Sequence, residues 1–269
     1  MKLNLSCWGC MQEAAPEAAG EKAVNVRPIG NSCFYDLTCP YGHQSYVLIQ
    51  NAKFEILFQS GLQALNAGYY REAISSIAAA LERFYEYSIM YCLCEKLFPG
   101  NAVAPEEAVL DKVNAFWAPI SKHSERQFGA FNALYYDRFD ESPIQFDGKF
   151  LKKHGLKLKK EPIDPIAFRN LVVHQGYIAT REQAIAYAEA VNKYIHTLAR
   201  RYWDRNQQWL YNMTTVDARL TAKQMGYSYQ NGNIMGVDKI TVATAINTFI
   251  RVTDENYILG EPSVMQLIK

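Results

Sequence analysis

The chain has 269 residues and is 49% hydrophobic and 13% aromatic, which is enough for a packed core in one large domain or two smaller ones. Its 28 basic and 27 acidic residues nearly cancel, so any nucleic-acid-binding surface has to be a local patch. The N-terminus lacks the apolar core of a signal peptide, and there is no apolar run of the length of a transmembrane helix. We therefore expect a cytoplasmic protein with no membrane partner, whose cysteines are thiols or metal ligands rather than disulfides.

Two pairs of potential metal ligands lie near the N-terminus. Cys7 and Cys10 form a C-x-x-C pair, and Cys39 and His43 belong to the sequence Cys-Pro-Tyr-Gly-His. A C-x-x-C turn places two thiolates on one small loop, and a second knuckle of this kind completes a tetrahedral Zn²⁺ site. We predict a structural zinc site at these four residues, with Cys33 as the alternative to His43. Four protein ligands leave no open position for a catalytic water.

Residues 1–50 are expected to form a small β module that resembles a zinc ribbon. Ser32–Thr38 and Gln44–Ile49 alternate in the manner of short strands. The polar, alanine-rich segment from Met11 to Arg27 is expected to be a loop or a short helix between the two knuckles. The alternatives are ordinary buried cysteines or a redox C-x-x-C, although no βαβ pattern supports the redox interpretation. Binding of nucleic acid or a partner by this module is a further option.

From residue 51 to residue 208 the apolar residues recur three and four positions apart, which predicts helices. The first two would form an antiparallel hairpin. Thr180 and Gln183 have the spacing of a capping box at the start of the last one. The expected helices are Lys53–Ala67, Tyr69–Leu97, one from Pro105 to a kink or end at Pro119, Ser124–Phe139, Pro165 to about Gln175, and Thr180–Arg205.

A basic segment precedes the fifth of these helices. Asp140–Ile163 has no regular pattern, and it carries six lysines between Lys149 and Lys160. The plain interpretation is a solvated turn with short strands. The functional interpretation is a phosphate-facing lip, because lysines without planar stacking partners make sequence-independent contacts.

The most informative stretch is the helix from Pro165 to about Gln175, which contains Arg169, Asn170 and His174. Asn170 and His174 are four residues apart and share a helix face. Arg169 and His174 are five apart, about 140° around the helix. They converge only if the arginine side chain swings over, the helix distorts, or a second copy supplies one of them. The alternative is a helix end with a structural histidine and a surface arginine.

The sequence Arg-Asn-x-x-x-His, followed by Gly-Tyr-Ile and Thr-Arg-Glu-Gln-Ala-Ile-Ala-Tyr-Ala-Glu, resembles the last two helices of HEPN (higher eukaryotes and prokaryotes nucleotide-binding) domains. The resemblance covers roughly Asn51 to Arg205, and Arg169, Asn170 and His174 stand at the motif positions. It implies a helical bundle. It also implies a metal-independent endoribonuclease that acts as a dimer in phage defence, toxin–antitoxin or CRISPR-associated systems. The implied partners are RNA, with tRNA among the candidates, a second copy of the chain, and an antitoxin or defence protein.

The three motif residues suit RNA cleavage by the adjacent 2′-hydroxyl. His174 fits the acid/base role because imidazole titrates near neutral pH. Arg169 fits the anionic phosphorane, since a guanidinium matches phosphate geometry and stays charged. Asn170 would orient His174 or bind a phosphate. The products would carry a 2′,3′-cyclic phosphate and a 5′-hydroxyl.

Two other functions stay open at this point. Some HEPN domains do not cleave RNA and act as interaction scaffolds. A transcription regulator that uses the zinc module and the C-terminal tail on DNA is the other option, although the near-neutral charge and the lack of a clear recognition helix weigh against it.

The C-terminal residues 209–269 are expected to form a short α+β extension. Thr215–Met225 is predicted to be a short helix, and Asn231-Gly232 is a hairpin signal. Val242–Val252 suits a helix or a strand. The predicted fold is thus mainly α: a HEPN-like helical bundle over residues 51–208, with a small N-terminal β zinc ribbon and this extension.

Overall fold

The computed structural model describes residues 2–7, 9–10, 24–32, 34–49, 51–97, 107–159, 163–224, 234–237 and 264. The chain divides into two compact units. The first contains Met1–Asn51 and Thr214–Thr241, and the second contains Ala52–Met213 and Val242–Lys269. Residues 209–269, set apart above as an extension, are shared between the two units. The described part of the chain is mainly helical.

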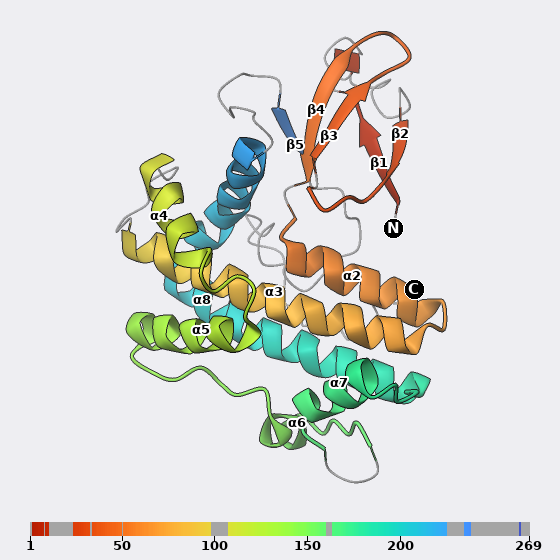
Figure 1. Ribbon diagram of the computed structural model, residues 1–269, viewed down its shortest axis with the longest axis vertical. Helices are drawn as coiled ribbons and strands as arrows, with labels where there is room; N and C mark the ends of the chain where they lie inside the picture. Colours follow the sequence, from red (N-terminus) through yellow and green to blue (C-terminus); the bar gives the residue numbers. More distant parts are fainter. Residues whose placement is uncertain are drawn as a thin grey trace. The chain divides into compact units, whose positions relative to one another are not determined.

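The first unit is built from short strands (Figure 1). Strand β1 (Lys2–Ser6) pairs antiparallel with β2 (Val24–Pro28). A second sheet has the order β3-β4-β5, in which β3 (Phe34–Thr38) pairs antiparallel with β4 (Gln44–Ile49). Strand β5 (Ile234–Val237) joins the other edge of β4 in parallel. The C-terminal part of the chain therefore completes a sheet begun near the N-terminus.

The strands predicted around the second knuckle are confirmed, with the first beginning at Phe34 rather than at Ser32. Val24–Arg27, expected within a loop or short helix, lies in β2, because its alternation of valines with polar residues suits a strand. Of the predicted hairpin, Ile234–Val237 is a strand that pairs in parallel with β4. Its turn at Asn231-Gly232 and the segment Val242–Val252 lie outside the described residues.

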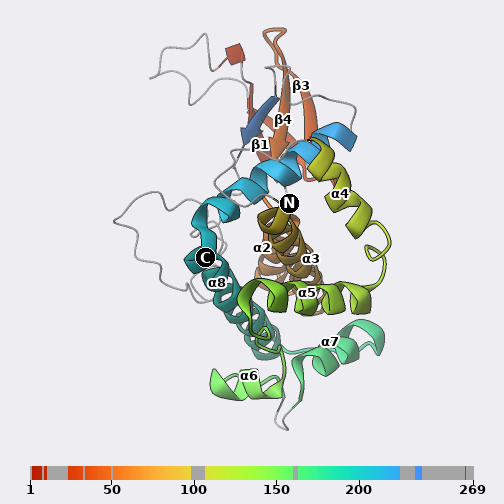
Figure 2. The ribbon, with the colours of Figure 1, turned by 90° about the vertical axis from the view of Figure 1, so that its left-hand side faces the viewer.

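Helix α3 (Tyr70–Leu97) is the central helix of the second unit. Helix α2 (Lys53–Asn66) packs along it as the other arm of the predicted helical hairpin (Figure 1 and Figure 2). Helices α4 (Glu107–Trp117), α5 (Ser124–Phe139) and α7 (Pro165–His174) also contact α3. The expected end or kink at Pro119 is an end, at Trp117.

Helix α8 (Arg181–Gln224) packs on α3 through large aromatic side chains. The Tyr91 hydroxyl donates to the Tyr202 carbonyl at 3.1 Å, and the rings of the two tyrosines lie 4.6 Å apart. Asn206 has non-helical φ and ψ of −157° and 90°, so the helix is interrupted one residue after the predicted end at Arg205. The predicted helix Thr215–Met225 falls within the helical segment that follows this interruption and ends at Gln224.

The basic segment before α7 contains a helix where a turn with short strands was expected. Helix α6 (Gly148–Lys153) begins at Asp147, whose side chain accepts hydrogen bonds from the backbone N–H groups of Lys149 and Phe150. Phe150 is buried, with its ring 5.5 Å from that of Tyr194 on α8. The cap and the buried aromatic ring together favour a helix over a solvated turn.

None of the helices among the described residues combines the length and apolarity that a membrane-spanning segment requires.

Candidate functional site

The second metal knuckle is a tight turn between β3 and β4. Cys39 follows the last residue of β3, and its N–H donates to the His43 carbonyl at 2.9 Å. The Gly42 N–H donates to the Cys39 carbonyl, also at 2.9 Å. Gly42 has a φ of 85°, a left-handed conformation that glycine adopts without strain. The turn therefore places the Cys39 and His43 side chains side by side.

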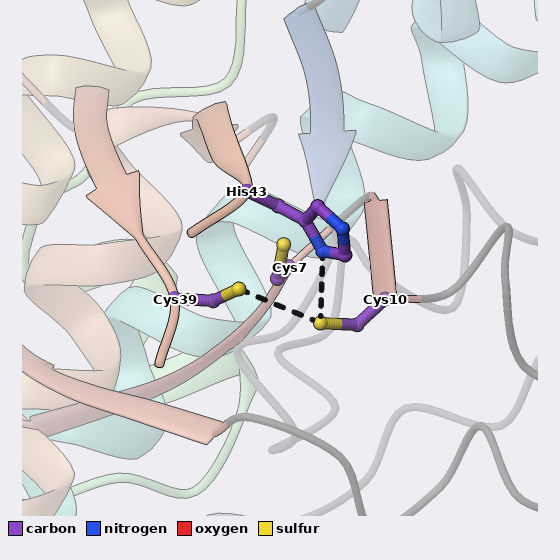
Figure 3. A group of neighbouring side chains, drawn as sticks. All are labelled: Cys7, Cys10, Cys39 and His43. Atoms are coloured by element: carbon purple, nitrogen blue, oxygen red, sulfur yellow. Dashed lines mark hydrogen bonds between the residues drawn. The ribbon is translucent and has the colours of Figure 1, made fainter. Parts of the chain in front are cut away.

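The first knuckle brings Cys7 and Cys10 to the same place, and the four predicted ligands converge (Figure 3). The ligand atoms of Cys7, Cys10, Cys39 and His43 all lie within 4.8 Å of one another. The Cys10 sulfur is 3.6 Å from the Cys39 sulfur and 3.4 Å from His43 Nδ1. In a tetrahedral zinc site with Zn–S bonds of about 2.3 Å, neighbouring sulfurs lie roughly 3.8 Å apart. The cluster thus has nearly the dimensions that the ion requires.

Packing around the cluster restricts the residue between the two N-terminal cysteines. The three cysteines are buried, and His43 is half-buried. A Cβ atom on Gly9 would lie 2.7 Å from Cγ of His43, closer than real contacts allow. A glycine at position 9 therefore lets the imidazole approach the sulfurs. Cys33, the alternative ligand, lies outside the described residues.

The thiols influence one another's ionisation. Burial raises the pKa of the Cys7 thiol, but hydrogen bonds from Ser45, Cys10 and Cys39 outweigh burial and lower it to about 7. Burial, together with the neighbouring Cys39 and Cys7, raises the pKa of Cys10 to about 12. Several thiolates in so small a space need a cation to balance their charge. The Cys₃His cluster could thus bind a metal ion such as zinc.

The helix that carries the second candidate site begins and ends as its sequence indicates. One Asp164 carboxylate oxygen accepts hydrogen bonds from the N–H groups of Ile166 and Ala167 at 2.8 and 3.2 Å, and Pro165 is the first residue of α7. His174 is its last residue. The cap defines the first residue of α7, and the helical repeat then determines on which side of the helix each later side chain lies.

Helix α7 turns one face to the bundle and leaves the motif at its edge. Phe168 and Val172 are fully buried, whereas Arg169 and Asn170 are half-buried and His174 is exposed. The apolar residues anchor the helix, so the three polar side chains have a fixed base and remain accessible.

Arg169 brings the three side chains together. Its Nη1 atom lies 3.0 Å from Oδ1 of Asn170 and 3.2 Å from Nε2 of His174. Of the three ways in which arginine and histidine could meet, the structure adopts the first: the long arginine side chain reaches over. A single chain therefore makes this contact without a second copy.

The contact pairs an imidazole with a permanent cation. A guanidinium has only donors, so Nε2 of His174 can accept a hydrogen bond from Arg169. A group able to act as an acid or base therefore lies next to a group that can bind an anion.

Glu82 on α3 is a fourth member of the site that sequence reasoning missed. Its Oε1 atom lies 3.0 Å from Nη2 of Arg169, and the Arg169 and Glu82 side chains are 26% and 36% exposed. Glu82 lies outside the apolar stripe of α3, which marks it as a surface acid. Nothing in the local sequence links it to an arginine on α7, because the packing of α3 against α7 creates the pair.

Tyr187 on α8 is a buried neighbour of the charged groups around Arg169. Burial raises the pKa of its hydroxyl, the Arg169 charge opposes that rise, and the charges of Glu82 and Asp164 add to it. The ring is nearly fully buried and packs 6.0 Å from that of Phe168. Tyr187 therefore packs against the buried side of α7. Sequence analysis identified Tyr187 only as a residue of a predicted helix.

Comparison of the chain with protein-family models, with curated proteins and with solved structures finds no match in any of the three. What the site can do must therefore be argued from its own geometry.

Proposed function

We propose that the helical unit is a HEPN-like, metal-independent endoribonuclease that cleaves RNA by attack of the 2′-hydroxyl. The observation that carries the proposal is the contact of 3.2 Å between Nη1 of Arg169 and Nε2 of His174. It joins an imidazole, which can act as an acid or a base, to a permanent cation of phosphate-binding geometry. The HEPN resemblance of the motif supports the choice of RNA as substrate.

In this proposal the Arg169 N–H that contacts Nε2 of His174 turns to the substrate phosphate. Nε2 then takes the 2′-hydroxyl proton, and the oxygen attacks the adjacent phosphorus. Arg169 then neutralises the phosphorane, the role in which a preorganised cation contributes most. Asn170 already accepts a hydrogen bond from Arg169 at 3.0 Å and keeps the guanidinium in place. The leaving 5′-oxygen takes up a proton, which gives a 2′,3′-cyclic phosphate and a 5′-hydroxyl.

A homodimer would balance the protons of the proposed reaction. A neutral imidazole that accepts the 2′-hydroxyl proton cannot at the same moment protonate the 5′-oxygen. A second copy of the motif would supply that acid as its own His174 in the protonated form. We therefore propose that two chains form one composite cleft. A role in phage defence or a toxin–antitoxin system, with an antitoxin or defence partner, rests on the resemblance alone.

We further propose that the cluster of Cys7, Cys10, Cys39 and His43 holds a structural Zn²⁺ in a zinc-ribbon-like module. The sulfur and nitrogen donors, their spacing and the room that Gly9 leaves for the imidazole all suit that ion. Four protein ligands would leave no position for a catalytic water, so the reaction is assigned to α7 and not to the metal.

The test is cleavage of total RNA and of tRNA by wild type, His174→Ala and a matched control, His123→Ala. His123 is also exposed, at the start of α5, where its side chain makes no capping hydrogen bond. The assay contains EDTA, and the zinc content of the protein is measured afterwards so that loss of the structural ion is not mistaken for loss of a catalytic one.

We expect wild type and His123→Ala to give fragments with 2′,3′-cyclic phosphate ends, and His174→Ala to give none. Equal cleavage by all three proteins would assign the activity to another site or to a contaminant. No cleavage by any of them, at concentrations where the chain is dimeric, would favour a non-catalytic HEPN scaffold.

A further inference from the structure

A cavity of about 510 Å³ lies between α6 and the start of α7. Its volume is within the range of small-molecule and cofactor pockets. Leu151 and Leu158, which are 4% and 2% exposed, belong to its apolar lining. Lys152, Lys157 and Lys159 also line it. The basic segment noted in the sequence thus borders a pocket rather than an open turn.

The charges of the pocket select its ligand. Among the described lining residues there are three lysines and one acid, Asp164, and one carboxylate oxygen of Asp164 already accepts hydrogen bonds from the N–H groups of Ile166 and Ala167. The described part of the lining therefore carries a net positive charge beside apolar side chains. A ligand that fits both features has a flat, weakly polar body and a negative group at its edge, as a nucleotide does.

The pocket is continuous with the helix of the proposed active site. Asp164 both lines the pocket and caps α7, and Arg169 follows it by about 7.5 Å along the helix axis. Lys159 also lines the pocket, and its ammonium lies 5.1 Å from the ring centre of Tyr177, just beyond the motif. Lys159 therefore connects the pocket lining with Tyr177, which follows the end of α7.

We propose that this pocket is a subsite for one nucleotide of the RNA strand whose scissile phosphate binds Arg169. The base enters the apolar part of the pocket, and Lys152 and Lys157 contact the phosphates on either side. This inference takes the identity of its ligand from the proposed ribonuclease function. It adds a place where the enzyme holds, and selects among, the nucleotides near the cut.

Gly148 allows the pocket to be filled without disturbing the fold. It lines the pocket as the first residue of α6, a Cβ atom there would meet nothing within 4 Å, and its φ is not positive. Gly148→Met adds a long side chain to the lining of the pocket, while Gly148→Ala adds one carbon and serves as the matched control. Both variants are made in the His174→Ala chain, so that RNA stays intact during the measurement.

Binding of a fluorescent RNA oligonucleotide is measured by anisotropy over a range of salt concentrations. We expect Gly148→Met to weaken binding about tenfold with little change in the salt dependence, and Gly148→Ala to bind within about twofold of its parent. Lys152→Ala with Lys157→Ala should lower the slope of log K against log salt by about 0.7 for each phosphate that the protein no longer neutralises. The control pair is Lys149→Ala with Lys153→Ala, on the same helix but outside the pocket lining.

The inference is overturned if Gly148→Met binds RNA as tightly as Gly148→Ala, or if the two lysine pairs reduce the slope equally. Cleavage is scored separately in chains with His174 intact. Pocket-dependent binding without any cleavage would remove the nuclease proposal and leave the subsite. If Gly148→Met cleaves RNA at the same rate and position as wild type, the nuclease proposal remains and the subsite is removed.

Discussion

Replacing Arg169 by lysine separates what this residue contributes to folding from what it contributes to catalysis. The change keeps the positive charge and removes the planar group. Arg169 uses two nitrogens: Nη1 contacts Asn170 and His174, and Nη2 contacts Glu82. A lysine offers one ammonium nitrogen for all three partners.

The effect on stability should be small. The Arg169 and Glu82 side chains are 26% and 36% exposed, and ion pairs of such exposure contribute about 0.2–1 kcal/mol. The anchoring of α7 depends on Phe168 and Val172, which stay in place. We therefore expect Arg169→Lys to unfold within a few degrees of wild type in a circular-dichroism melt.

The effect on cleavage should be large. Removing one preorganised donor from a developing negative charge costs about 2.7–4 kcal/mol of transition-state stabilisation, or about 10²–10³ in rate. Single-turnover cleavage of a defined RNA measures this loss directly. Glu82→Gln is the companion variant: it keeps the shape of the contact with Arg169 and removes one charge from it.

Two results would refute this reasoning. Cleavage by Arg169→Lys within about threefold of wild type would mean that the guanidinium does not bind the reacting phosphate. A melting temperature that falls as far as that of a core variant would mean that the contacts of Arg169 are structural, and the loss of cleavage would then say nothing about the chemistry.

Three further predictions concern stability and metal. His196 is 2% exposed, and burial lowers its pKa from 6.5 to about 4. In the unfolded chain His196 therefore takes up a proton at a higher pH than in the folded protein. The free energy of unfolding of wild type should fall by up to about 3 kcal/mol as the pH falls from about 6.5 to about 4. Above pH 6.5 His196 should make no such contribution. Chemical denaturation of wild type and His196→Gln at several pH values should show this slope in wild type alone. We expect metal analysis to find about one zinc per chain in wild type and none in Cys39→Ser, while the helical circular-dichroism signal persists in both. Gly61→Ala should lower the free energy of unfolding by about 1–3 kcal/mol, because its Cβ would lie 2.5 Å from Cγ1 of Ile77. Gly129→Ala, whose Cβ would lie in open space, should raise the free energy of unfolding by about 0.5–1 kcal/mol. Equal denaturation midpoints for the two variants would contradict the close packing of α2 on α3.

Features set by neighbouring residues were predictable. The Asp164-Pro165 start of α7 follows from capping chemistry, and the spacing of Cys39 and His43 encodes one tight turn. The four-residue spacing of Asn170 and His174 also predicted that these two side chains lie on the same face of α7. It left open how Arg169 meets His174, because helical spacing describes the Cα positions and not the reach of a long side chain.

Features created by distant packing were not predictable. Glu82 pairs with α7 only after α3 and α7 pack together. Helix α6 was not predicted, because the many lysines of the segment suggested a solvent-exposed turn. The cap at Asp147 and the buried ring of Phe150 instead stabilise a helix. The parallel pairing of β5 with β4 was not predicted, because no local sequence pattern indicates which strand β5 will contact.

The late arrival of β5 gives the chain an order of assembly during translation. The ribosome releases β1 to β4 and both metal knuckles first, but the free edge of β4 has to wait until Ile234–Val237 has been made. Helices α2 to α8 leave the ribosome in the interval. Premature termination before Ile234 would therefore leave the β4 edge open, and such an edge recruits other chains. The strand Ile234–Val237 thus protects this sheet only after most of the chain has been made.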